Sequence, residues 1–166
     1  QEIAEAIRKL GNQGGVADTI RGAALSGQQK YDESMGALQS AFTANPDALL
    51  PMVNVVKTYL AMKKPDEAQA FVQSVLKANP ANAEAHVLMG LIELSKNSLD
   101  QAEKSFNVAI ERQPKNIAGY RALSDLHMRR RNPDAAFKVV SAGLKELPGN
   151  FTLRLALGMN ELMHGV

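Results

Sequence analysis

The side chains in this sequence that could do chemistry are few and widely separated. His86, His127 and His164 have no second metal-ligand residue three or four positions further on, as a helical metal site would need. The chain contains no cysteine, which excludes a disulfide framework, a cysteine-based zinc site and a thiol nucleophile. No Ser/His/Asp set or paired-carboxylate site emerges either. We therefore predict a non-catalytic chain with no cofactor and no metal, in which His86 and His127 are packed or half-buried.

Two short motifs suggest phosphate binding, but helix ends explain both more simply. Gly11, Gly14 and Gly15 resemble a phosphate loop, yet no strand precedes them and no Lys-Ser/Thr pair follows. We interpret them as a helix stop and a turn. The basic run 129–131 could grip an anionic polymer, but we expect it to end a helix, complement the helix dipole and stay solvated. A net charge of +2 adds no general attraction, so we predict no nucleic-acid partner.

The chain is organised by an internal repeat with a period of about 34 residues. Prolines mark this period at Pro46, Pro80, Pro114 and Pro148. Three further columns keep the same step: Asp32, Asp66, Asp100 and Asp134; Ser34, Ala68, Ala102 and Ala136; and Ala41, Val75, Ala109 and Gly143. Four columns that hold one period over four copies indicate a repeat architecture.

Each copy is expected to form two helices. The copies span residues 15–48, 49–82, 83–116 and 117–150, and the third is predicted to contain helices Ala83–Ser95 and Leu99–Arg112. Asn82, Asn116 and Asn150 stand where a side-chain oxygen can cap the first helix of the following copy. The recurring aspartate lies in the first turn of each second helix, and the recurring proline stops that helix. The fold class is therefore all-α.

These columns resemble the tetratricopeptide repeat, a helix-turn-helix unit of the same period. The third copy carries the match most fully, and its matching residues are Met89, Gly90, Ala102, Phe106, Ala109 and Pro114. Val56 and Ser124 depart from the family by replacing its first-helix glycine. The resemblance implies a right-handed α-solenoid with a partial repeat at each end. Residues 1–14 are then the end of a preceding repeat and residues 151–166 the first helix of a following one, so we interpret the chain as part of a longer array.

The resemblance also implies a binding surface. First helices line the concave face of such a solenoid, and Val16 and Thr19 are contact positions of the first copy. The groove that we predict from the other copies consists of Leu50, Val53, Asn54, Lys57, Val87, Leu91, Leu94, Arg121, Asp125 and Met128. Its apolar middle, flanked by Lys57 and Arg121, suits a peptide or helix with apolar anchors. The alternative interpretation is that Leu60 and Leu94 simply pack within the repeats.

One subclass of the family is not favoured by these residues. Modules that clamp the carboxylates of a chaperone tail carry lysine, asparagine and arginine at defined positions. The matching positions here are Thr19, Ala23, Asn54, Glu84 and Leu88. Only Asn54 fits, and Glu84 would repel a carboxylate, so we do not expect a chaperone-tail clamp.

The resulting hypothesis is a protein-binding scaffold that helps to assemble a larger complex. The sequence of residues 64–68 and 143–157 is similar to that of bacterial repeat lipoproteins of exopolysaccharide export and PEP-CTERM sorting, which implies a lipid-anchored parent in the periplasm or outer membrane. Otherwise we expect a cytoplasmic protein. An alternative is a regulatory or substrate-recruiting domain of an enzyme such as a glycosyltransferase, and a third hypothesis is self-association through residues 151–163. No apolar stretch is long enough to predict a membrane span.

Overall fold

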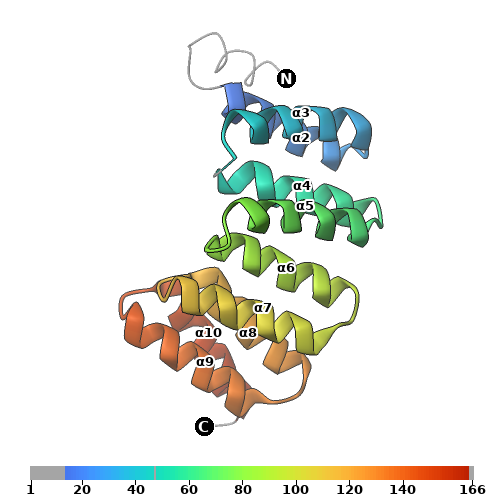
Figure 1. Ribbon diagram of the computed structural model, residues 1–166. Coiled ribbons are helices and arrows are strands. Elements are labelled where there is room, and N and C mark those ends of the chain that lie inside the picture. Colours follow the sequence, from blue (N-terminus) through green and yellow to red (C-terminus); the bar gives the residue numbers. More distant parts are fainter. Residues whose placement is uncertain (1–13, 47, 165–166) are drawn as a thin grey trace. The chain divides into compact units, whose positions relative to one another are not determined.

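The described part of the chain is entirely helical. The computed structural model describes residues 14–46 and 48–164, with the backbone alone for Gly14 and for residues 160–164. These residues form nine helices: α2 (Gly14–Gly27), α3 (Tyr31–Ala44), α4 (Leu49–Ala61), α5 (Pro65–Ala78), α6 (Ala83–Ser95), α7 (Leu99–Arg112), α8 (Ile117–Arg129), α9 (Pro133–Glu146) and α10 (Phe151–His164) (Figure 1). The all-α prediction is confirmed, as are both predicted helices of the third copy. The expectation for residues 1–13 lies outside the described residues.

The chain divides into two units, with the boundary after Gln73 inside α5. In unit 1, α2 packs against α3 and α4, and α3 packs against α4. In unit 2, from α6 to α10, each helix packs against the next one along the chain. The alternate helices α6 and α8, and α8 and α10, also contact each other. The α2–α3 pair therefore stacks on α4 in unit 1, and the α6–α7 pair, the α8–α9 pair and α10 stack in unit 2.

Each helix pair is closed by the same left-handed turn. The residue after the first helix and its cap has a positive φ in all four copies: 61° at Gln29, 58° at Lys63, 59° at Asn97 and 55° at Arg131. The next N–H then donates to the carbonyl five residues back: Lys30 to Leu25 (3.0 Å), Lys64 to Tyr59 (2.9 Å), Ser98 to Glu93 (2.8 Å) and Asn132 to His127 (2.9 Å). This is the Schellman pattern, which satisfies carbonyls at a helix end. None of the four residues is glycine, so residue type alone does not predict this turn.

The predicted N-caps are confirmed by hydrogen bonds. The side-chain oxygen of Asn82 accepts from the N–H of Ala85 at 2.9 Å. Asn116 and Asn150 do the same for the N–H groups three residues further on, at 2.6 and 3.0 Å. Asn132 adds a fourth such cap at the start of α9, which we did not predict. Each bond satisfies a donor that the first helical turn leaves without an intrahelical partner.

The small-residue columns lie in the core. At another position of the repeat, a residue of the first helix and the residue that faces it on the second helix compensate each other in size. A Cβ on Gly90 would lie 2.3 Å from Cε1 of Phe106, and one on Gly22 would lie 2.5 Å from Cγ of Leu38. The corresponding positions in the other two copies hold smaller partners: Val56 with Val72, and Ser124 with Val140, all buried. Copies with a glycine in the first helix therefore carry a large residue at the facing position of the second helix, and copies without it carry valine.

The glycines at the start of the first copy correct one expectation. Gly14 and Gly15 are the first two residues of α2 rather than part of a turn. A Cβ on Gly15 would lie 3.4 Å from the carbonyl oxygen of Ala41 and 3.7 Å from Cβ of Ala44. Gly15 therefore serves close packing between the start of α2 and the end of α3. Gly11 lies outside the described residues.

Candidate functional site

In unit 1, the predicted groove residues lie along α4. Leu50 is 65% exposed and Lys57 is exposed, whereas Val53 and Asn54 are half-buried. The Asn54 amide donates to the carbonyl of Leu50 at 2.9 Å, which commits one of its donors within the helix. Leu50 is therefore the most accessible apolar side chain of this set.

Buried hydroxyl groups hold α4 in place. Thr58 donates to Ser26 Oγ at 3.0 Å, and Ser34 donates to the carbonyl of Gly22 at 2.7 Å. The hydroxyls of Ser34 and Thr58 are themselves 3.5 Å apart. Ser34 and Thr58 are fully buried, so these bonds satisfy polar groups that would otherwise be costly to bury. Together they join α2, α3 and α4 and fix the positions of α2 and α4.

An apolar pocket opens where α2 and α4 begin and α3 ends. Its volume is about 370 Å³, which lies within the range of small-ligand pockets and is ample for one or two apolar side chains. The lining residues are Gly15, Val16, Thr19, Ile20, Ala41, Asn45, Ala48, Leu49, Leu50 and Pro51. Val16, Thr19 and Leu50 were predicted as contact positions. The Thr19 hydroxyl is bonded to the carbonyl of Gly15 at 2.5 Å, so the pocket wall offers mainly apolar contacts.

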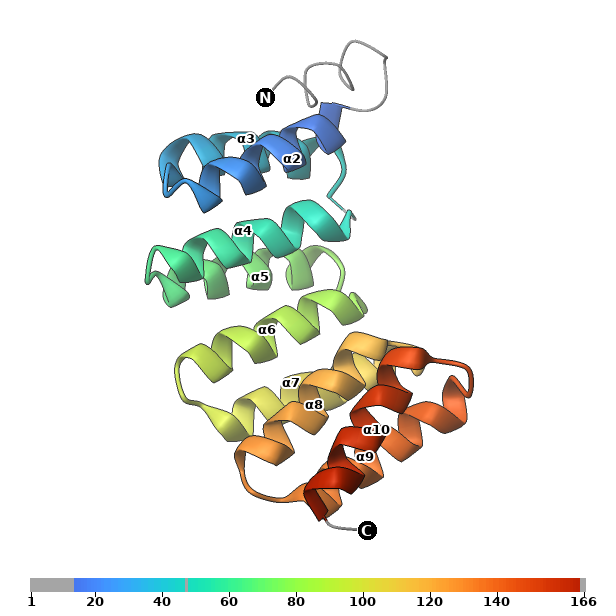
Figure 2. The ribbon, with the colours of Figure 1, turned by 180° about the vertical axis from the view of Figure 1, so that it is seen from behind.

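In unit 2, the first helices α6, α8 and α10 lie on one side, with α7 and α9 behind them (Figure 2). Leu91 on α6 is 40% exposed. Val87 is only 5% exposed and belongs to a core cluster with Phe106 and Leu126, and Leu94 packs against that cluster. Val87 is therefore a core residue and not an accessible groove residue, because α6 is covered at that height by α7 and α8.

The exposed side of α8 carries a row of charges. Arg121, Asp125 and Arg129 follow one another at four-residue spacing, and all three are exposed. At 1.5 Å per residue, neighbouring members of the row are about 6 Å apart along the helix. The surrounding protein partly covers the Asp125 carboxyl, and this loss of hydration raises its pKa; the lowering effect of Arg121 and Arg129 only partly offsets the rise. Met128 is half-buried beside this row.

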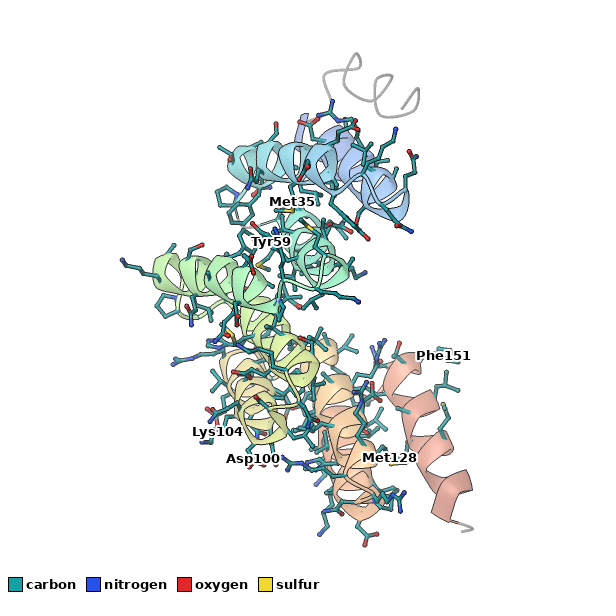
Figure 3. All side chains as sticks on the ribbon, turned by 90° about the vertical axis from the view of Figure 1, so that its right-hand side faces the viewer. Met35, Tyr59, Asp100, Lys104, Met128 and Phe151 are labelled. Atoms are coloured by element: carbon teal, nitrogen blue, oxygen red, sulfur yellow. The ribbon has the colours of Figure 1, made fainter. Side chains whose placement is uncertain are left out.

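Three exposed residues of α10 were missing from the predicted groove. Phe151, Leu155 and Met159 are 76%, 54% and 57% exposed and recur every four residues on one side of the helix. Figure 3 places Phe151 at the beginning of α10. The repeat period could have identified them, because Leu155 and Met159 follow Arg121 and Asp125 by one period. From the sequence we had considered residues 151–163 only as a surface for self-association.

The basic run at the end of α8 is only partly solvated, contrary to expectation. Arg130 donates to Asp100 and Glu103 on α7, at 2.5 Å in each case. Figure 3 shows Asp100 at the edge of unit 2 opposite Phe151. Nε2 of His127 lies 3.9 Å from Glu103, so this histidine is half-buried at the α7–α8 contact, as predicted. Arg130 therefore joins two helices rather than serving an anionic ligand.

Other kinds of site are not evident in the described part of the chain. Among its residues, no group of three histidine, aspartate or glutamate side chains could hold a metal ion. Within the same residues, no helix is both long and apolar enough to span a bilayer.

The packing and the sequence together define a helical-repeat protein. The sequence profile of the tetratricopeptide repeat matches residues 25–92 and again residues 59–126, so the two matches are offset by one repeat period and cover more than half of the chain. The chain belongs to the tetratricopeptide repeat family. A search of curated protein sequences finds no match.

Solved structures share this fold. A thermophilic tetratricopeptide-repeat protein of Thermus thermophilus is 17% identical, with a TM-score of 0.77 over 97% of this chain and 88% of that one. Yeast Tom70 is 20% identical, with a TM-score of 0.81 over 98% of this chain but 35% of Tom70. The first repeat domain of Spaghetti (RPAP3), bound to the HSP90 peptide SRMEEVD, is 20% identical, with a TM-score of 0.53 over 70% and 93%. At these identities the likeness shows the fold alone.

Proposed function

We propose that this chain is a non-catalytic scaffold that binds peptide or protein segments through the first helices of its repeats. The observation that carries the proposal is the apolar pocket of unit 1, with Leu50 at its wall. A pocket of about 370 Å³ that is lined mainly by apolar atoms fits an apolar side chain of a partner. The RPAP3 domain provides a precedent within the fold, since it is a tetratricopeptide domain with a bound peptide.

The proposed contact residues form one set in each unit. On α4 they are Leu50, Val53, Asn54 and Lys57, with the pocket wall at the start of α2. In unit 2 they are Leu91, Arg121, Asp125 and Met128, to which we add the exposed stripe of α10. Apolar anchors would supply most of the binding energy, and the charged residues would select among partners.

A library of random peptides displayed on phage tests the unit 1 surface. We expect the chain to enrich peptides that share apolar anchors, and we expect Leu50→Glu to abolish their binding. Because Leu50 is 65% exposed, the variant should fold normally. Phe137→Glu is the matched control, since Phe137 lies on α9, outside the pocket, and is 39% exposed. Selected peptides that bind Leu50→Glu as well as the original chain would refute the pocket as the binding site.

We also propose, on the narrower resemblance of residues 64–68 and 143–157, that the parent protein acts in a bacterial envelope complex of the exopolysaccharide-export or PEP-CTERM type. The competing hypothesis is a regulatory domain of a larger enzyme such as a glycosyltransferase. The gene upstream and downstream of these residues distinguishes them. A lipobox would support the lipoprotein, and an encoded catalytic domain would support the enzyme.

A further inference from the structure

The exposed face of α6, α8 and α10 in unit 2 combines charges with apolar residues in a way that specifies a partner. We propose that this face binds a helical segment carrying Glu-x3-Lys-x3-Glu, or the same pattern with Asp or Arg, with apolar residues along one flank. This inference rests on the proposed function, because it names the partner chemistry for the unit 2 surface.

The repeat period aligns the three helices of this face. Arg121 and Leu155 are separated by one period and so occupy equivalent positions on α8 and α10. Leu91, Asp125 and Met159 form the next level in the same way, one helical turn further on. Because α8 contacts both α6 and α10, the charged row on α8 lies between an apolar residue on α6 and an apolar stripe on α10.

The apolar stripe of α10 supplies the anchors. Single exposed apolar residues are normal on protein surfaces and need no explanation. Phe151, Leu155 and Met159 are instead consecutive members of one helical face, and each is more than half exposed. Their spacing of four residues matches the spacing of residues on a partner helix that lies alongside α10. A helix with an apolar flank could therefore bury this stripe.

The charge row of α8 supplies the specificity. Arg121 and Arg129 would pair with partner carboxylates eight residues apart on a helix, about 12 Å along its axis. Asp125, midway between them, would accept a lysine or arginine of the same partner face. Its carboxyl already loses hydration to the surrounding protein, which raises its pKa, so a cation placed there would be favoured and a carboxylate repelled. The pattern that fits is therefore acidic, basic, acidic.

Arg130, which is next to Arg129 in the sequence, does not belong to the charge row of α8. Its guanidinium points to α7, where Asp100 and Glu103 accept its hydrogen bonds. The adjacent Arg129 is exposed. Of the three consecutive arginines, the structure thus directs one to the α7–α8 contact and leaves Arg129 in line with Arg121.

Two designed helical peptides test the proposal against the complete 166-residue chain. The first carries Glu-x3-Lys-x3-Glu with leucine after each charged residue, in an alanine-rich background. The second carries Lys-x3-Glu-x3-Lys with the same leucines. Both have the same type of internal ion pair, so both have comparable helix stability. We expect fluorescence anisotropy to show that the first peptide binds about 10- to 100-fold more tightly, and we expect the preference to shrink at high salt.

Variants of the chain separate charge readout from apolar anchoring. The triple substitution Arg121→Glu, Asp125→Lys and Arg129→Glu should reverse the preference between the two peptides. Leu155→Glu with Met159→Glu should weaken the binding of both. These positions are exposed, and circular dichroism checks that the variants remain helical.

Three results would overturn the inference: binding of neither peptide, equal binding of both, or a preference that survives the triple substitution. Self-association of the unmodified chain in analytical ultracentrifugation, abolished by Leu155→Glu, would also overturn it by assigning the face to a second copy. None of these results bears on the pocket of unit 1, which Leu50→Glu tests separately. Failure of this inference and failure of the proposed function are therefore distinguishable.

Discussion

The close contact between Gly90 and Phe106 leads to a quantitative prediction about stability. Replacing Gly90 with alanine adds a Cβ that would lie 2.3, 2.6 and 2.8 Å from three atoms of the Phe106 ring. Ordinary carbon–carbon contacts are about 3.5–4.0 Å. The ring has no exposed surface and cannot turn into solvent to relieve the overlap. We expect overpacking to cost up to about 3 kcal/mol, of which better helix propensity returns about 1 kcal/mol.

The matched control is Gly36→Ala. Gly36 also lies inside a helix, α3, but nothing lies within 4 Å of an added Cβ. Here the helix-propensity gain of about 1 kcal/mol should appear undiminished. The two substitutions should therefore differ by roughly 3 kcal/mol although their chemistry is the same. Urea unfolding followed by circular dichroism measures this difference, provided that the m-values remain equal.

A second substitution tests the size compensation itself. Phe106→Val alone should cost about 2–4 kcal/mol through lost burial and a cavity. Combined with Gly90→Ala, it creates a pair similar to Ser124 with Val140 in the fourth copy. The double variant should therefore be more stable than the sum of the two single effects by about 1–3 kcal/mol. Strict additivity, or a Gly90→Ala variant stabilised as much as Gly36→Ala, would refute the reasoning.

Other contacts lead to three further predictions. Asp125→Asn should stabilise the chain at neutral pH, because partial burial raises the pKa of Asp125 and so disfavours its ionised form in the folded state. In thermal melts, this advantage should vanish as the pH falls through the raised pKa to below the ordinary value of 3.8. A constant or reversed difference between the variant and the original chain would contradict the prediction. Asn116→Ala should lower the free energy of unfolding by about 2 kcal/mol, and Asn132→Ala by about 1 kcal/mol, as measured by urea unfolding. The difference arises because Asn116 is 2% exposed whereas Asn132 is exposed. Equal losses would contradict the role of burial. Lys63→Gly should raise the melting temperature, since a φ of 58° costs a residue with a side chain about 1 kcal/mol, and a lowered melting temperature would count against strain at this turn.

The local features of the fold were predictable because they depend on neighbours in the sequence. The bounds of α6 and α7 followed from apolar periodicity, and the caps at Asn82, Asn116 and Asn150 followed from their positions before those periodic stretches. A cap needs only a side-chain oxygen and an N–H group three residues further on. The repeat columns extended this local information to four copies, since equivalent residues in a stack have equivalent neighbours.

The left-handed turns and the ends of the repeats were less predictable. A positive φ usually signals glycine, but these turns hold Gln29, Lys63, Asn97 and Arg131, because the stacked helices impose the turn and outweigh its cost. Gly15 was wrongly predicted to lie in a turn, because glycine is common in turns. Glycine also permits close approach between helices, and a single sequence does not distinguish the two uses.

The candidate binding surface was predicted only in part. Repeat position identified α4, α6 and α8 as its helices, but exposure depends on what covers each side chain. Val87 is in the core, whereas Leu155 and Met159, which were not among the predicted groove residues, are exposed. The pocket beside Leu50 also could not be predicted, because its walls come from three helices whose separation no sequence pattern specifies.

The sequence by itself determined the repeat, the helices and most helix caps of this protein, because these depend on periodicity and on hydrogen bonds between residues a few positions apart. Only the tertiary structure decided which groove positions are accessible, that Arg130 turns to α7 while Arg129 remains exposed, and that the starts of α2 and α4 enclose a pocket. Those outcomes depend on the distances and angles between helices, which side chains far apart in the sequence set together.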